Sequence, residues 1–150
     1  MIRLHLQDLQ TISARAETAY PKECCGLLAG REDAHGRLTV SRVVESPNTL
    51  ADPDSRGGQD RFEVDAQVRF DLMRALHGTD ERIIGHYHSH PDHPAKPSQH
   101  DLDMAFEPEL VWLITAVIKG HAGKTRAWRL NRETREIVDV DLHIIDIDED

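Results

Sequence analysis

The chain has 150 residues, of which 39% are hydrophobic and 30% charged. That length suits one domain with a buried core, so we expect a single domain over residues 1–150. The formal net charge of -9 argues against nucleic acid as a partner, because proteins that bind it usually carry a basic face. No apolar run approaches the roughly 18 residues of a membrane span, and residues 1–5 do not begin a secretory signal. We therefore expect no membrane partner and a cytoplasmic location.

The N-terminal half of the sequence contains one helical pattern and two strand patterns. Apolar residues recur at helical spacing up to Ala16, a short apolar run ends at Gly30, and an alternating segment follows. The predicted elements are a helix over residues 6–19, strands over 24–29 and 38–45, and a loop over 46–60. The loop is rich in Pro, Gly, Asn, Asp and Ser, and we expect its part at about 49–60 to be mobile.

The second half of the sequence predicts more strands than helices. Its most apolar run, from Leu110 to Ile118, is typical of a central strand buried on both faces. The other predicted elements are an extended piece at 62–64, helices over about 66–76 and from 98 to about 106, strands over 82–88, 125–130 and 136–145, and an acidic tail over 146–150. Because several strands are adjacent in sequence, the order predicts an α+β fold, a mixed α/β sandwich of sheet and helices.

The segment from Gly85 to Asp101 carries most of the chemistry. His86, His88 and His90 alternate, so they lie on one face of a strand end. The Cα atoms of neighbours in this set are about 6.6 Å apart, a distance that two imidazoles can span to bind one ion. The Cα atoms of His86 and His90 are about 13 Å apart, which is too far for the two to share an ion comfortably. Spacing alone therefore leaves two candidate ligand pairs, His86 with His88 or His88 with His90.

Asp101 is a candidate third ligand, because a catalytic zinc usually takes three protein ligands and one water. A structural alternative exists, since Ser98 and Asp101 have the spacing of a capping box at the start of a short helix. That motif usually ends in Glu or Gln, however. With this composition, His-x-His followed by Ser and Asp at these offsets arises by chance in roughly three chains per thousand.

The pattern His88-Ser-His90-Pro, followed by Ser-x-x-Asp101, resembles the JAMM (MPN-plus) zinc metalloprotease family. The family's pattern begins one aromatic residue before the first ligand, here Tyr87. The resemblance therefore implies one zinc ion per chain with His88, His90 and Asp101 as ligands, and it leaves His86 as a neighbour. It also implies the family's fold, a cytidine-deaminase-like mixed β-sheet flanked by helices.

The family also needs a glutamate far upstream, on a strand beside the metal, and Glu23 stands at the expected place. The structural alternative is a surface carboxylate next to Lys22. Against that alternative, an acid at the mouth of an apolar strand is costly unless it has partners. The segment from Asn48 to Asp65 also resembles the family, so the resemblance covers nearly the whole chain.

The resemblance implies a peptidase mechanism without a covalent intermediate. Zinc held by two imidazoles and one carboxylate keeps an open position for water and lowers its pKa toward about 7. Glu23 would act as general base and then as general acid, and Ser98 would donate a hydrogen bond to the developing oxyanion. Ser98 is disfavoured as an acyl nucleophile, because metal and base already activate water.

Cys24 and Cys25 are adjacent, so a disulfide between them would be strained and would join nothing distant. On a strand they point to opposite faces, and alternation places Cys25 on the side of Glu23. The structural interpretation is two small buried residues. The Glu-Cys-Cys-Gly segment also resembles the small free-standing bacterial members of the family. Those members are associated with ubiquitin-like sulfur carriers and cleave off the group attached after a C-terminal Gly-Gly.

The leading hypothesis is a zinc metallopeptidase or isopeptidase that hydrolyses the amide bond after the C-terminal Gly-Gly of a ubiquitin-like or sulfur-carrier protein. The loop from Thr49 to Asp60 is the candidate substrate-binding wall. The alternatives are a non-catalytic MPN scaffold or binding module, and a cell-wall or phage-type peptidase with the same zinc core. A deaminase would need His-x-Glu with a distant Cys-x-x-Cys, and the sequence contains neither. The sequence leaves the oligomeric state open.

Overall fold

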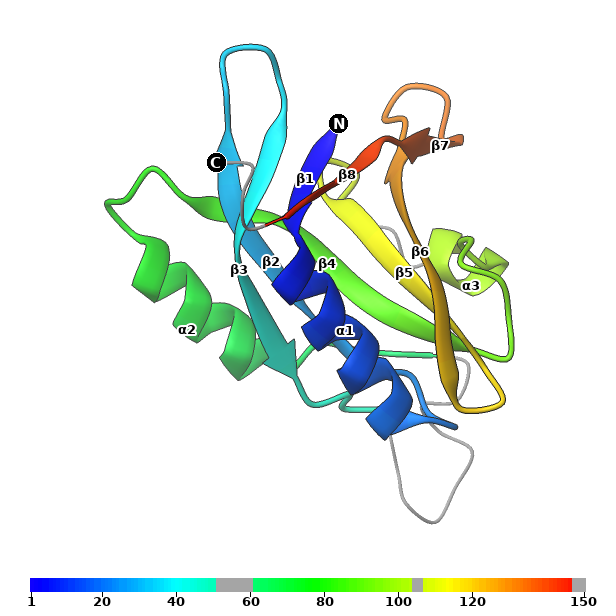
Figure 1. Ribbon diagram of the computed structural model, residues 1–150. Helices are drawn as coiled ribbons and strands as arrows, with labels where there is room; N and C mark the ends of the chain where they lie inside the picture. The colour runs from blue at the N-terminus through cyan, green and yellow to red at the C-terminus, as the bar shows by residue number, and fades with distance from the viewer. Residues whose placement is uncertain (51–60, 104–106, 147–150) are drawn as a thin grey trace.

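The computed structural model describes residues 1–50, 61–103 and 107–146, and within them the chain forms one mixed sheet with helices on both faces (Figure 1). In chain order the elements are β1 (Ile2–His5), α1 (Leu6–Ala19), β2 (Cys25–Glu32), β3 (Leu38–Ser46), α2 (Ala66–Leu76), β4 (Arg82–Pro91), α3 (Gln99–Asp103), β5 (Val111–Ile118), β6 (His121–Leu130), β7 (Ile137–Val140) and β8 (Leu142–Ile145). The strand order across the sheet is β7-β6-β5-β4-β2-β3-β1-β8. This arrangement confirms the predicted α+β class.

The two faces of the sheet bury different apolar clusters. On one face, Ile12 of α1 packs against a cluster that includes Leu28, Tyr87 and Leu113. On the opposite face, α2 covers β2, while the region around α3 covers β5 and β6 (Figure 1). β5 is buried on both faces, as its apolar run predicts. None of the helices in the described part of the chain has the length and apolar character needed to cross a membrane.

Both long helices cover the predicted residues, and α2 has a local signal at each end. The Asp65 side chain caps α2 by accepting the Gln67 N–H at 2.7 Å. Gly78, at φ +79°, follows the last turn in a conformation that favours glycine. Directly before α1, residues 2–5 form β1, a strand that the sequence did not predict and that pairs in parallel with β3 and β8.

The single strand predicted over residues 136–145 is wrong. The chain leaves β7 at Val140 and crosses to the other edge of the sheet, where β8 pairs with β1. The Asp141 carbonyl accepts the Ile2 N–H at 2.8 Å at this crossing. Polar and apolar residues keep alternating through the break, so the pattern that predicted a strand contains no sign of it. The predicted acidic tail lies largely outside the described residues, which end at Asp146.

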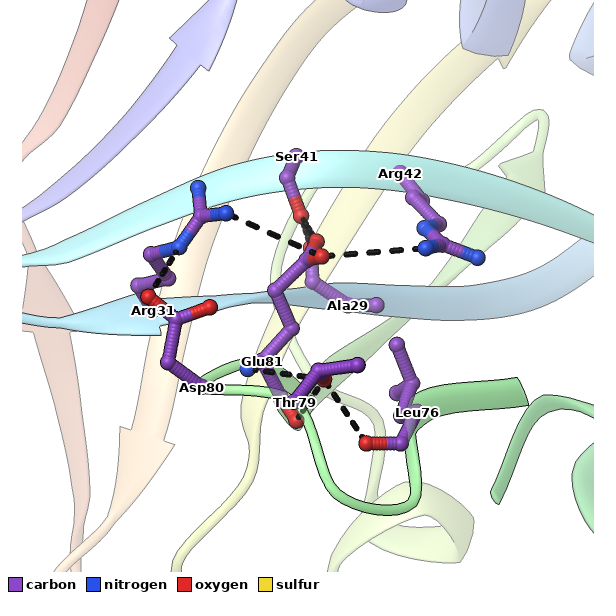
Figure 2. A network of polar contacts seen from close by, with 8 residues as sticks. All are labelled: Ala29, Arg31, Ser41, Arg42, Leu76, Thr79, Asp80 and Glu81. Carbon is purple, nitrogen blue, oxygen red and sulfur yellow. Dashed lines mark hydrogen bonds and ion pairs between the residues drawn. The ribbon is translucent and has the colours of Figure 1, made fainter. Parts of the chain in front are cut away.

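A polar network holds the irregular middle of the sheet (Figure 2). The register between β2 and β3 shifts just after Ala29 and leaves Ser41 without a directly opposite residue. The Ser41 hydroxyl lies 3.3 Å from the Ala29 carbonyl oxygen and also contacts the carboxylate of Glu81. That carboxylate is only 10% exposed and lies 3.8 Å from Arg31 and 3.7 Å from Arg42. Glu81 therefore ties the turn before β4 to both strands of the bulge.

We predict that Gly26→Ala destabilises the fold, because a Cβ there would lie 2.3 Å from both the Tyr87 ring and the Val44 carbonyl oxygen. Tyr87 is fully buried, and Arg15 donates to its hydroxyl at 2.8 Å, so the ring has little room to move. The expected loss is about 1–3 kcal/mol in free energy of unfolding, measured by urea denaturation. Gly123→Ala is the matched control, since its Cβ would meet only Ala116 O at 3.6 Å. Equal midpoints for the two variants would contradict the prediction.

Candidate metal centre

The site forms where the chain enters β2 beside the C-terminal end of β4. These strands pair antiparallel with Cys25 opposite His88, and backbone hydrogen bonding continues one residue beyond that pair. The same register, carried one residue further still, places Glu23 opposite His90. The ligand atoms of Glu23, His88 and His90 all lie within 4.8 Å of one another, and all three residues are buried.

Asp101 of α3 completes a triangle of ligand atoms with the two histidines. His88 Nε2 and His90 Nε2 are 3.1 Å apart, and Asp101 Oδ2 lies 3.4 Å from the first and 3.0 Å from the second. Ligands at about 2.0–2.1 Å from a tetrahedral ion are about 3.3 Å apart, so the triangle has the size of a metal site. Two imidazoles and a carboxylate are donors that zinc and similar divalent ions accept. The residues present therefore fit a metal ion.

Hydrogen bonds outside the triangle orient two of its members. His90 Nδ1 lies 2.9 Å from the Pro94 carbonyl oxygen, so Nδ1 carries the proton and Nε2 presents its lone pair to the triangle. Asp101 Oδ2 accepts the Ser98 N–H at 2.9 Å, and the Asp101 N–H donates to Ser98 Oγ at 3.1 Å. The capping box considered as a structural alternative is therefore present, and it holds the same carboxylate that faces the histidines.

The protonation states of this cluster suit metal binding. Burial lowers the pKa of His88 below its ordinary value, and it lowers the pKa of His86 to about 3. Burial alone would raise the pKa of Asp101, but hydrogen bonds with His88 and His90 hold it well below its usual range. Neutral imidazoles and an ionised carboxylate are the forms in which these side chains bind a metal.

Aromatic contacts surround His88 on the side away from the triangle. Its ring is stacked on Phe62, with centroids 4.2 Å apart and planes at 19°, and His86 lies 5.8 Å away. His86 also contacts Trp112 at 5.7 Å. Within the part of the chain that the structure describes, His88 Nδ1 and His86 Nδ1 are buried and have no hydrogen-bond partner. The sequence pointed to Phe62 only as part of the segment that resembles the family, because a ring contact over 26 positions follows no spacing rule.

The side chain of Asn48 joins three segments behind the site. Its Nδ2 donates to the carbonyls of Glu23 at 3.1 Å and Arg61 at 3.0 Å, and its Oδ1 accepts the N–H groups of Leu50 and Glu63, both at 3.1 Å. These four bonds use both donors and both acceptor positions of the amide. The sequence pointed to Asn48 only through the family resemblance, which assigned it no role.

The two cysteines are free thiols with structural surroundings. Cys25 lies opposite His88 and so on the face of the site, as alternation predicts. Its Sγ is buried among the carbonyls of Ser46, Pro47 and Glu63, at 3.7–3.8 Å. Burial raises the pKa of Cys25 to about 12 and that of Cys24 to about 11, so neither is a thiolate at neutral pH.

Two cavities meet at Glu23. One of about 300 Å³ is lined by Glu23, His90, Ser98 and the loop between them, and the other, of about 470 Å³, by the end of α1 and residues 45–48. Glu23 therefore lies where the two cavities adjoin. Of the loop predicted as a substrate-binding wall, from Thr49 to Asp60, residues 51–60 lie outside the described residues.

Comparison with known proteins identifies the family of this chain. The family model for prokaryotic homologs of the JAB domain matches residues 5–131. A desampylase of Haloferax volcanii is 33% identical over 94 residues, which are 63% of this chain and 62% of that protein. A CysO-cysteine peptidase of Mycobacterium tuberculosis is 28% identical over 130 residues, 87% of this chain and 82% of that protein. A solved protein from Desulfitobacterium hafniense has a TM-score of 0.78 at 26% identity, covering 97% of this chain and 94% of that one.

The family match covers most of the chain, and it includes Glu23 and the strand that carries His88 and His90. Relatives named as a peptidase and as a desampylase are consistent with a hydrolase. The chain belongs to the prokaryotic JAB-domain family and is a metallopeptidase of the JAMM type.

Proposed function

We propose that the protein hydrolyses the amide bond after the C-terminal Gly-Gly of a ubiquitin-like or sulfur-carrier protein, with one zinc ion per chain. The ligands would be His88, His90 and Asp101, and the observation that carries the proposal is their triangle of ligand atoms at 3.0–3.4 Å beside the buried Glu23. Relatives named desampylase and CysO-cysteine peptidase support a carrier-type substrate.

Zinc bound there would supply Lewis-acid activation of water at neutral pH. Glu23 would accept the proton of that water, and its membership of the same cluster as both histidines supports this role. It would then return the proton to the leaving amine. Since Ser98 Oγ already accepts the Asp101 N–H, its hydroxyl hydrogen is left to donate to the carbonyl oxygen as negative charge develops.

We predict that His88→Ala and His90→Ala abolish zinc binding, whereas His86→Ala largely preserves it. Each of the first two removes one of three ligand atoms, and His86 supplies none to the triangle. The measurement is zinc content per chain after dialysis, with circular dichroism as the check on folding. A zinc content unaffected by His90→Ala would refute the ligand assignment.

The variant Glu23→Gln distinguishes whether Glu23 is the general base or a metal ligand. We predict that this variant keeps zinc and its fold but loses about 10²–10⁴-fold in hydrolysis, because an amide cannot accept the proton of water. Ser98→Ala should likewise keep zinc and lose about 10²–10³-fold, the usual effect of removing one oxyanion donor. Both are measured as kcat with zinc content determined on the same sample. Loss of metal from Glu23→Gln would make Glu23 a ligand and overturn the assignment.

The substrate class is tested with sulfur-carrier proteins that bear C-terminal extensions after Gly-Gly. We predict cleavage directly after the second glycine, seen as product mass, and its loss when a chelator is added. Replacing the penultimate glycine of the carrier by valine should slow cleavage strongly, because only glycine lets the tail's backbone approach the metal closely. Equal cleavage of the valine carrier would show that the tail is not recognised in this way.

A further inference from the structure

We propose that Asn48 and Phe62 are positioning residues that together orient Glu23 and His88; the proposal rests on the roles given to those two groups above. The bonds of the Asn48 amide to residues 61 and 63 end on the carbonyl and the N–H that flank Phe62. The same amide donates to the Glu23 carbonyl. The Asn48 side chain therefore fixes the backbone at Glu23, the proposed base, and on both sides of Phe62. The Phe62 ring in turn contacts His88, a proposed metal ligand.

His88 needs such support because its outer nitrogen is not held in the usual way. A metal-binding histidine normally donates its second N–H to a carboxylate, a carbonyl or water, which sets the plane of the ring. In the described part of the chain His88 Nδ1 has no such partner, whereas His90 Nδ1 has the Pro94 carbonyl. The Phe62 ring is stacked on the imidazole of His88, with centroids 4.2 Å apart, and this contact sets the plane of the imidazole.

Glu23 needs support because it stands outside the sheet ladder. β2 begins at Cys25, so no ladder hydrogen bond of that strand fixes the Glu23 backbone. Instead, the Asn48 amide binds its carbonyl at 3.1 Å, and the next N–H, that of Cys24, donates to Ser89 Oγ at 2.8 Å. The side chains of Asn48 and Ser89 therefore help to fix the backbone that carries the Glu23 carboxylate.

The segment around Phe62 stays attached without the Asn48 side chain, which makes the proposal testable. The backbone of Asn48 forms a bridge with Val64, and the Thr49 N–H donates to the Glu63 carbonyl at 3.0 Å. Substituting Asn48 therefore removes its four side-chain bonds and leaves these backbone bonds in place. A folded variant with a disturbed site is the expected result.

The experiment measures zinc affinity by chelator competition, kcat and KM on a cleaved carrier, and thermal unfolding of the metal-free protein. Phe62→Leu should lower zinc affinity about 10–100-fold, the usual effect of losing a partner of a metal ligand, and Phe62→Tyr should restore it because the ring remains. Asn48→Ala should lower both zinc affinity and kcat with little change in KM. An absorption spectrum of the cobalt-substituted protein should shift in both Phe62→Leu and Asn48→Ala.

Two matched controls distinguish positioning from general stabilisation. Asn131 makes two similar side-chain bonds, to the N–H groups of residues 133 and 134, and Phe70 is an exposed phenylalanine of α2. Asn131→Ala and Phe70→Leu should leave zinc affinity and kcat unchanged. If Asn48→Ala and Phe62→Leu bind zinc as tightly as the wild type and lower only thermal stability, the proposal is overturned. A wild-type protein that binds no zinc would instead overturn the proposed function.

Discussion

The antiparallel pairing of β2 with β4 is the constraint on which the candidate site depends. Residues opposite one another in such a ladder share a face, so the register that sets Cys25 against His88 also sets Glu23 near His90. A slip of one residue would turn every side chain of β2 to the other face. The register shifts of β2 lie between Leu28 and Gly30, toward the end held by the Glu81 network, so the pairing is regular where the site forms (Figure 2).

The site is a polar strip inside an otherwise apolar face. Leu27 and Ala29 with α2 bury one side of it, and Trp112 and Ile114 with their cluster bury the other. Polar groups in such a place cost free energy unless they are paired, and here the imidazoles, the carboxylate and the backbone near them pair mainly with one another. The same burial that makes the cluster costly lowers the pKa of His88, so the fold favours the neutral, metal-binding form of that imidazole before any ion arrives.

The helices and most strands could be predicted from the sequence because their signals are local. Helical spacing located α1 and α2, alternation located β3, and a continuous apolar run located β5. Four residues are too few to reveal β1, and nothing local marks the crossing between β7 and β8. At the site, spacing placed the histidines on one face yet left two ligand pairs open. The structure brings His90 and Asp101 together with His88, and it places His86 against Trp112. That choice follows from long-range packing, which spacing does not contain.

Structural and chemical roles coincide at several positions of this chain. Ser98 and Asp101 form a capping box, and the bond that caps the helix also holds the carboxylate toward the histidines. The Pro94 carbonyl orients His90. The loop that contains it is fixed by the Trp128 indole N–H, which donates to the carbonyl of the neighbouring Ala95. A metal ligand needs hydrogen-bond partners that orient it, and partners close to it in sequence cost the least conformational entropy. Substitutions that displace the Asp101 carboxylate or the Pro94 carbonyl therefore change stability and metal binding together, and only the metal-free protein separates the two effects.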